Sequence, residues 1–165
     1  MNRERIEETI RLWQAEPDKA KGKPTVIARA EGSKAVMEHG SFSWHTDMPV
    51  PLGGANEAPS PTALLLSALA GCAVVFIRDT LAPQLGVTVD AIEARAECVT
   101  DARGLLGINA VAPDLSNISL TITIQSSESE DAVARVYQAW QERCPVYLAL
   151  TKALSVATTL DIKRA

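Results

Sequence analysis

The stretch SPTALLLSALAGCAVVFI, residues 60–77, decides the fold of this chain. Ser60 followed by Pro61 predicts a helix start, because the serine hydroxyl can cap free amides and proline suits the first turn. Large apolar side chains then cover every face of a helix that we expect to run toward Leu81, so protein must surround it on nearly all sides. The apolar run 63–77 has only 15 residues, fewer than the roughly 20 of a bilayer span. It predicts a buried helix.

The size of the chain bears on how such a helix can be buried. The 165 residues, 47% hydrophobic and 22% charged, are typical of one globular domain. A domain of this size encloses an all-apolar central helix most easily if a second copy supplies part of the wall. We therefore expect a homodimer.

Charge and termini exclude some partners and compartments. The net charge is −4, and no basic block is present that could follow a phosphate backbone, which argues against nucleic acid. The first residues, MNRERIEETIRLW, are charged where a secretory signal needs an apolar core. We expect a cytoplasmic protein with no membrane partner, whose thiols are kept reduced.

The N-terminal part divides into an appendage and a meander. Apolar residues at helical spacing predict an amphipathic helix over residues 2–16, and a Gly- and Pro-containing linker follows. We therefore assign residues 1–23 to an N-terminal helix and linker, and residues 24–165 to the main domain. Three short extended pieces separated by glycines predict an antiparallel meander: TVIARA, SKAVMEH and SFSWHTD. Four prolines and two glycines then make residues 48–61 a loop.

The second half predicts an α+β domain. Alternating apolar residues indicate strands in GVTVDAIEARAECV and NISLTITIQ, and VATTLDIK near the C-terminus is expected to form a closing strand. Helices are predicted over residues 128–142 and from residue 144. The first of these should turn four side chains inward: Val133, Val136, Tyr137 and Trp140. Strands and helices in this order favour α+β over a doubly wound fold.

The three cysteines differ in their expected surroundings. Cys72 is either a small core residue or a reactive thiol, and because burial raises a thiol pKa, reactivity would need a cation beside it. Cys144 stands before Pro145, which places it at the start of a helix where its sulfur can cap free amides. Cys98 belongs to the buried face of a strand and is assigned no chemistry. No nucleotide-binding, serine-hydrolase or zinc motif is present, so we expect neither a metal nor a cofactor.

Two segments carry a family resemblance. APSPTALLLSALAGC and, some seventy residues later, RCPVYLAL resemble the OsmC and Ohr family, the osmotically inducible and organic hydroperoxide resistance proteins. The similarity of layout extends over about residues 24–163 and is greatest to a divergent, general OsmC-like branch. It implies an intertwined α+β homodimer, with antiparallel sheets packed around long central apolar helices and active sites at the subunit interface.

The resemblance also implies a mechanism. A two-cysteine thiol peroxidase would use Cys72 to attack the O–O bond of an organic hydroperoxide, which converts it to a sulfenic acid. Cys144 would resolve that acid as a disulfide, and an external dithiol, such as a dihydrolipoyl protein, would reduce it by exchange. An apolar pocket would favour alkyl or lipid hydroperoxides over hydrogen peroxide.

One position departs from the family pattern. Relatives carry a glutamate ten residues before the reactive cysteine, paired with an arginine, and this chain has Thr62 there. Glu57 and Arg29 are the candidates for these two roles; otherwise another network activates Cys72, or peroxidase activity is weak. Thr62 also favours an alternative, a non-catalytic homodimer that binds a small apolar ligand. A thiol redox sensor that uses the same Cys72–Cys144 disulfide is a further alternative.

Overall fold

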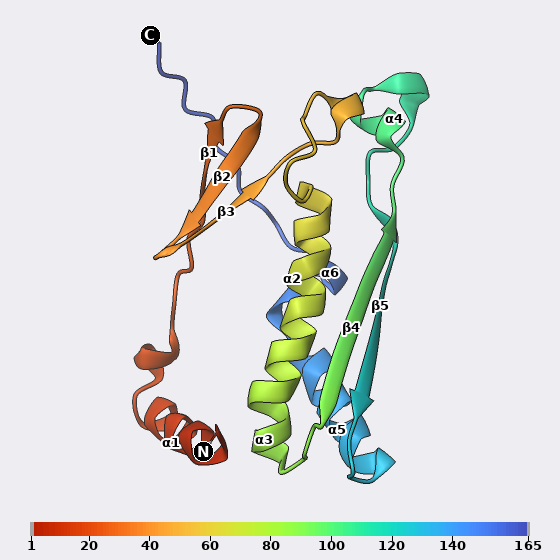
Figure 1. Cartoon of the computed structure of the whole chain (residues 1–165). Coiled ribbons are helices and arrows are strands. Elements are labelled where there is room, and N and C mark those ends of the chain that lie inside the picture. The colour runs from red at the N-terminus through yellow and green to blue at the C-terminus, as the bar shows by residue number, and fades with distance from the viewer. Residues whose placement is uncertain (1, 165) are drawn as a thin grey trace.

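The central feature is one long helix (Figure 1). The structure, a computed structural model, describes residues 2–164. Helix α2 (Pro61–Phe76) continues through a π-helical turn (Ile77–Leu81) into α3 (Ala82–Leu85). As predicted, the Ser60 side chain caps it, accepting a hydrogen bond from the N–H of Ala63. The helix is thus longer than its apolar run.

By length and composition, the Pro61–Leu85 helix is apolar enough to cross a membrane, yet only 22% of its most apolar window is buried in one chain. A core helix that a second copy covers has the same properties. Its open side carries small or apolar residues, all exposed in one chain: Ser67, Ala68, Gly71 and Val75. We call these four residues the open face of α2.

A two-stranded ribbon packs along the opposite side of α2. Strands β4 (Ala91–Val99) and β5 (Ser116–Gln125) are antiparallel, and their half-buried apolar residues alternate with exposed ones, as the sequence predicts. Between them lie two short elements that the sequence did not predict, α4 (Ala102–Leu105) and a 3-10 turn (Ile108–Ala110). Helices this short have no periodicity to detect.

The core lies where α5 (Glu130–Arg143) crosses the C-terminal part of the central helix, next to α6 (Pro145–Thr151). Val136 and Trp140 are almost fully buried, as predicted. The prediction that Tyr137 points inward is wrong, because it is 42% exposed. Successive side chains in an α-helix are rotated by about 100° about its axis, so Tyr137 lies off the buried stripe that contains Val136.

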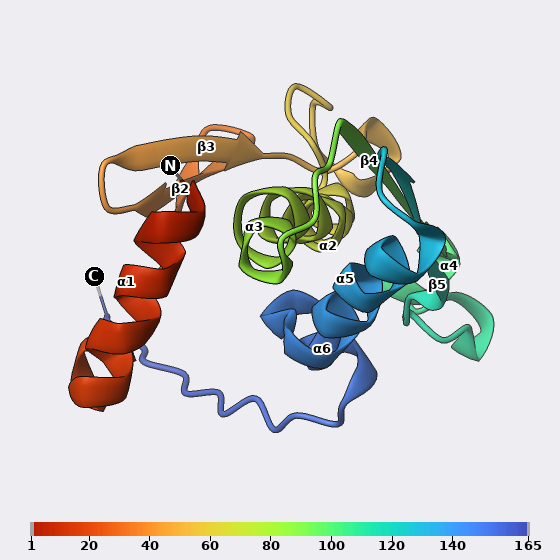
Figure 2. The same ribbon diagram turned by 90° about the horizontal axis from the view of Figure 1, so that it is seen from below.

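The meander forms as predicted. Strands β1 (Ile27–Glu31), β2 (Lys34–His39) and β3 (Phe42–Thr46) make an antiparallel sheet in that order. Gly32 and Gly40 stand in its two turns with positive φ. This sheet is separate from the β4–β5 ribbon, and Figure 2 shows it on the opposite side of α2 from α5 and α6. The predicted α+β class, with antiparallel sheets and a long central helix, is confirmed.

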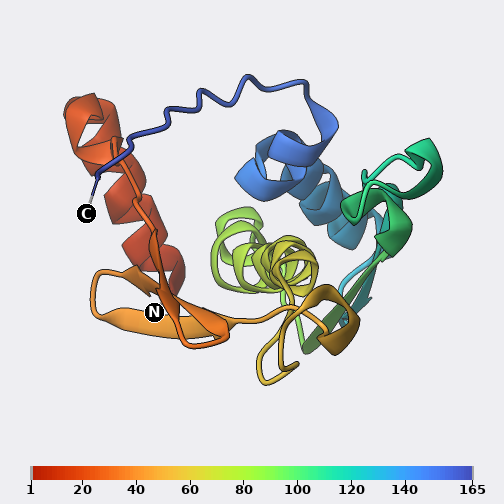
Figure 3. The same ribbon diagram turned by 90° about the horizontal axis from the view of Figure 1, so that it is seen from above.

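The two chain ends behave differently. Helix α1 (Asn2–Ala15) packs on α3 and the π-helical turn through half-buried Ile6 and Ile10, so it docks on its own chain. The domain boundary near residue 23 stays a prediction. Residues 153–164 have no regular structure, so the predicted closing strand is not formed within one chain. A strand needs an edge to pair with, and Figure 3 shows this segment crossing open space beyond α6.

Candidate functional site

Cys72 and Cys144, 72 positions apart in the chain, meet at the centre of the molecule. Their sulfur atoms are 3.2 Å apart, and both thiols are free. Cys144 is fully buried between α5 and α6, while Cys72 is half-buried in the middle of α2. A disulfide has a sulfur–sulfur bond of about 2.05 Å, so the sulfurs need to approach by only about 1 Å to bond.

Helix α6 begins at this pair of sulfurs. Cys144 is its N-cap and Pro145 its first residue, as predicted, and the Cys144 Sγ accepts a hydrogen bond from the N–H of Tyr147 at 3.5 Å. The backbone N–H of Val146 acts on the Cys72 thiol as well and lowers its pKa. Free amides at a helix start stabilise negative charge, so α6 holds both sulfurs in a partly electropositive setting.

Burial nevertheless keeps Cys72 protonated within one chain. Burial, followed by the hydrogen bond and charge of Cys144, raises the pKa of the Cys72 thiol to about 11, and the N–H of Val146 only partly offsets this. Within residues 2–164, no arginine or lysine side chain contributes to this pKa. The expectation that burial raises this pKa is confirmed.

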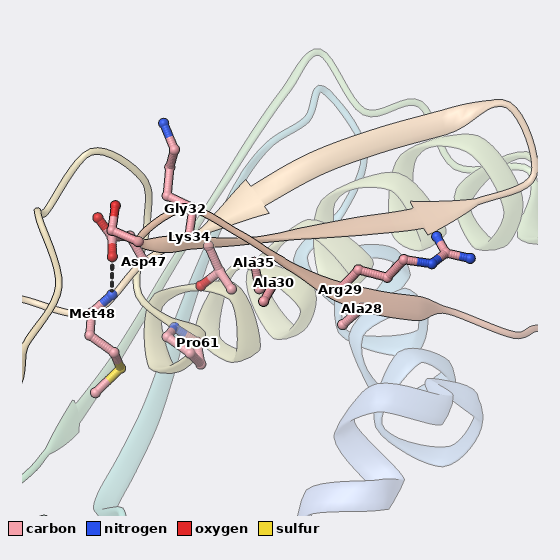
Figure 4. Close-up of a pocket in the computed structure, with 11 residues that line it drawn as sticks. Ala28, Arg29, Ala30, Gly32, Lys34, Ala35, Asp47, Met48 and Pro61 are labelled. Atoms are coloured by element: carbon pink, nitrogen blue, oxygen red, sulfur yellow. Dashed lines mark hydrogen bonds between the residues drawn. The ribbon is translucent and has the colours of Figure 1, made fainter. Parts of the chain in front are cut away.

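The structure places Arg29 and Glu57 away from this pair of sulfurs. Arg29 on β1 pairs with Glu38 of the neighbouring strand, and Glu57 pairs with Lys34 at 2.8 Å. Among the hydrogen bonds of the described residues, none joins Arg29 or Glu57 to Cys72. Arg29 lines a hollow of about 420 Å³ between the meander and the start of α2, and Figure 4 shows its side chain extending away from Asp47.

Asp47, which is not among the site residues predicted from the sequence, organises the loop before α2. Its carboxylate is 3% exposed and accepts hydrogen bonds from the backbone N–H groups of Met48, Ala55 and Glu57, at 2.7, 3.1 and 2.9 Å. The bond from Glu57 is the main cause that lowers the pKa of Asp47 below its usual value. An aspartate directly before a Pro- and Gly-rich loop was the available signal.

We expect Asp47→Asn to destabilise the protein in a pH-dependent way. Because the folded pKa of Asp47 is lowered, its carboxylate contributes stability above the unfolded pKa of about 3.9, and this is lost as the pH falls through the folded value. The difference in unfolding free energy between wild type and Asp47→Asn should therefore be largest near neutrality and shrink in acid. Urea unfolding at several pH values measures it, with the exposed Asp114→Asn as the control for loss of charge. An equal difference at all pH values would contradict this assignment.

A second hollow flanks the start of α2. It has a volume of about 600 Å³ and lies between the loop after β3 and the segment that joins β4 to β5. Its walls are mostly aliphatic, and Thr62, where the family resemblance implies a glutamate, lines it together with Leu65, Leu105 and Leu115. We call it the loop cavity. Neither cysteine of the central pair lines it.

The remaining candidates supply no further site. Cys98 is half-buried on β4, on the strand face that the sequence predicts. Across residues 2–164, no group of three or more His, Cys, Asp and Glu side chains is placed to hold a metal ion.

Comparison with known proteins gives a consistent result. The model of a family described as OsmC-like protein matches residues 54–159, and no curated protein matches the sequence. The fold is similar to that of an OsmC-like protein from Mycoplasma pneumoniae, with 22% identity, a TM-score of 0.67, and coverage of 79% of this chain and 89% of that chain. It is also similar to an organic hydroperoxide resistance protein OsmC from Legionella pneumophila, with 22% identity, a TM-score of 0.57, and coverage of 78% and 89%.

Proposed function

This chain belongs to the OsmC-like family, whose model covers well over half of it, and from that premise we propose that it is a thiol-dependent peroxidase for organic hydroperoxides. The similarity to an organic hydroperoxide resistance protein supports this class of activity. The observation that carries the proposal is the 3.2 Å separation of the Cys72 and Cys144 sulfurs at the start of α6.

The first step oxidises Cys72. Its thiolate attacks the distal oxygen of the hydroperoxide, the O–O bond breaks, and two electrons pass from sulfur to the peroxide. Cys72 becomes a sulfenic acid, and the alkoxide leaves as an alcohol after taking up the proton that the thiol lost. Cys72 is the proposed nucleophile because the neighbouring Cys144 is fully buried.

The second step forms the disulfide. The Cys144 sulfur attacks the sulfenic sulfur, and the oxygen leaves as water with the thiol proton. An external dithiol then reduces the disulfide by exchange and is itself oxidised to a disulfide. A dihydrolipoyl group is the proposed reductant class.

We propose that the active form is a homodimer. The open face of α2 and the unpaired segment 153–164 both leave apolar surface in water; Val156 and Leu160 are 83% and 84% exposed. Fully burying one such side chain contributes roughly 1.5–3 kcal/mol. A second copy can cover the helix face and offer a strand edge to the segment. Both features thus support the proposed homodimer.

The dimer also bears on activation of Cys72. With a pKa of about 11, the thiol needs a nearby cation to react at neutral pH, and its own chain supplies none within residues 2–164. Arg29 of a second copy is the proposed cation and Glu57 its proposed partner, each released from the pair it makes within one chain. Thr62 cannot take part in an ion pair, so any carboxylate must come from elsewhere.

Thiol counting tests the proposed function. One equivalent of an alkyl hydroperoxide, added to the reduced protein, should lower the free thiols per chain from three to one, which is Cys98. Mass spectrometry of the digested protein should find Cys72 linked to Cys144. A count that stays at three, or a disulfide to Cys98, would overturn the assignment. A single oxidation without repeated turnover on excess dithiol would instead favour a redox sensor.

The loop cavity favours a second candidate, binding of a small apolar ligand without catalysis. Its aliphatic walls and volume of about 600 Å³ suit a drug-sized apolar molecule. Here Cys72 would react with peroxide no faster than free cysteine, and a fluorescent fatty acid would bind with the same affinity in reduced and oxidised protein. Leu115→Trp, which places a larger side chain in the cavity, should weaken that binding and leave the thiols unaffected.

A further inference from the structure

A buried hydrogen-bond donor lies in the apolar cluster that also contains the two sulfurs. The Trp140 side chain is 1% exposed, and its Nε1–H has no hydrogen-bond acceptor among the described residues. Buried polar groups in folded proteins are nearly always hydrogen-bonded, and leaving one unpaired costs free energy. Within residues 2–164, this is the one buried side-chain nitrogen or oxygen without a partner.

Two contacts place Trp140 near Cys144. Trp140 precedes Cys144 by one helical turn, and its carbonyl accepts the N–H of Cys144 at 2.8 Å. Its ring lies 4.9 Å from the ring of Tyr147, the residue whose backbone N–H bonds to the Cys144 sulfur. Trp140, Cys144 and Cys72 pack in one apolar cluster.

We propose that the Trp140 indole N–H is the hydrogen-bond donor for the oxygen atom that the Cys72–Cys144 site acquires on reaction with a hydroperoxide; this inference rests on the proposed peroxidase function. Thiols and disulfides are weak acceptors, whereas a sulfenic oxygen is a good one. The donor therefore gains a partner only while the oxygen is present. A hydrogen bond that exists only in the reacting state stabilises that state selectively.

The test uses Cys144→Ser, which keeps a capping side chain on α6 and stops the reaction at the Cys72 sulfenic acid. The three tryptophans give three indole N–H signals in a ¹H–¹⁵N NMR spectrum, assigned with the variants Trp13→Phe and Trp44→Phe. One equivalent of alkyl hydroperoxide should move only the Trp140 indole proton downfield, and the intact mass should rise by one oxygen atom. Trp13 and Trp44 are the internal references.

A second variant separates hydrogen bonding from packing. In the Cys144→Ser background, Trp140→Phe keeps an aromatic ring and removes the N–H, so the sulfenic acid should decay about tenfold faster. A merely structural role would instead lower the stability of the reduced and oxidised forms equally and leave the decay rate unchanged.

The outcomes are distinct. If the mass shows the sulfenic acid while the Trp140 signal stays in place, the inference is overturned and the peroxidase proposal survives. If no oxygen is added at Cys72, the peroxidase proposal fails and the inference fails with it.

Discussion

Cys72→Ser is expected to lower dithiol-dependent turnover of an alkyl hydroperoxide by at least about 10³-fold, because it removes the nucleophile. Cys144→Ser should instead complete one oxidation per chain and then stop, since no second sulfur lies 3.2 Å from the sulfenic acid. Consumption of hydroperoxide in the presence of dihydrolipoamide measures both effects.

The matched control is Cys98→Ser. This thiol lies half-buried on β4, outside the central pair, so its loss should leave turnover unchanged. Turnover by Cys72→Ser at the wild-type rate would exclude Cys72 from the mechanism. Equal losses in Cys72→Ser and Cys98→Ser would point to a general effect on the fold.

Gly71→Arg is expected to convert the proposed dimer into monomers. A Cβ atom at Gly71 meets no atom within 4 Å in one chain, so the backbone position itself leaves room for a side chain in the isolated subunit. Arginine also favours a helix over glycine by close to 1 kcal/mol. Burying its charge against a second α2 should cost several kcal/mol and raise the dimer dissociation constant at least about 10³-fold. Sedimentation equilibrium measures this constant.

The control for Gly71→Arg is Gly22→Arg, which adds the same side chain at a linker glycine that is equally free of neighbours. It should leave the dimer intact. If the dimer supplies the activating cation, dilution of the wild-type protein below its dissociation constant should raise the pKa that alkylation of Cys72 follows toward about 11. An unchanged dimer in Gly71→Arg would remove the open face of α2 from the interface.

Local patterns in the sequence determined most of the elements. Strict alternation predicts β4 and β5, glycine spacing predicts the turns of the meander, and Ser60–Pro61 predicts the start of α2. The Cys-Pro pair predicts the cap of α6 in the same way. Each of these depends on residues a few positions apart, whose conformational preferences and hydrogen bonds act within the segment.

Only the tertiary structure decided the contacts between residues that lie far apart in the sequence. It places the Cys72 and Cys144 sulfurs 3.2 Å apart, pairs Arg29 with Glu38, and leaves Cys72 with a pKa of about 11 and no cation of its own chain within the described residues. It also leaves segment 153–164 without a strand edge. Periodicity records which side of a helix or strand is apolar, whereas the partner on that side depends on how distant segments pack. A pKa depends on that packing, because burial and neighbouring charges set it.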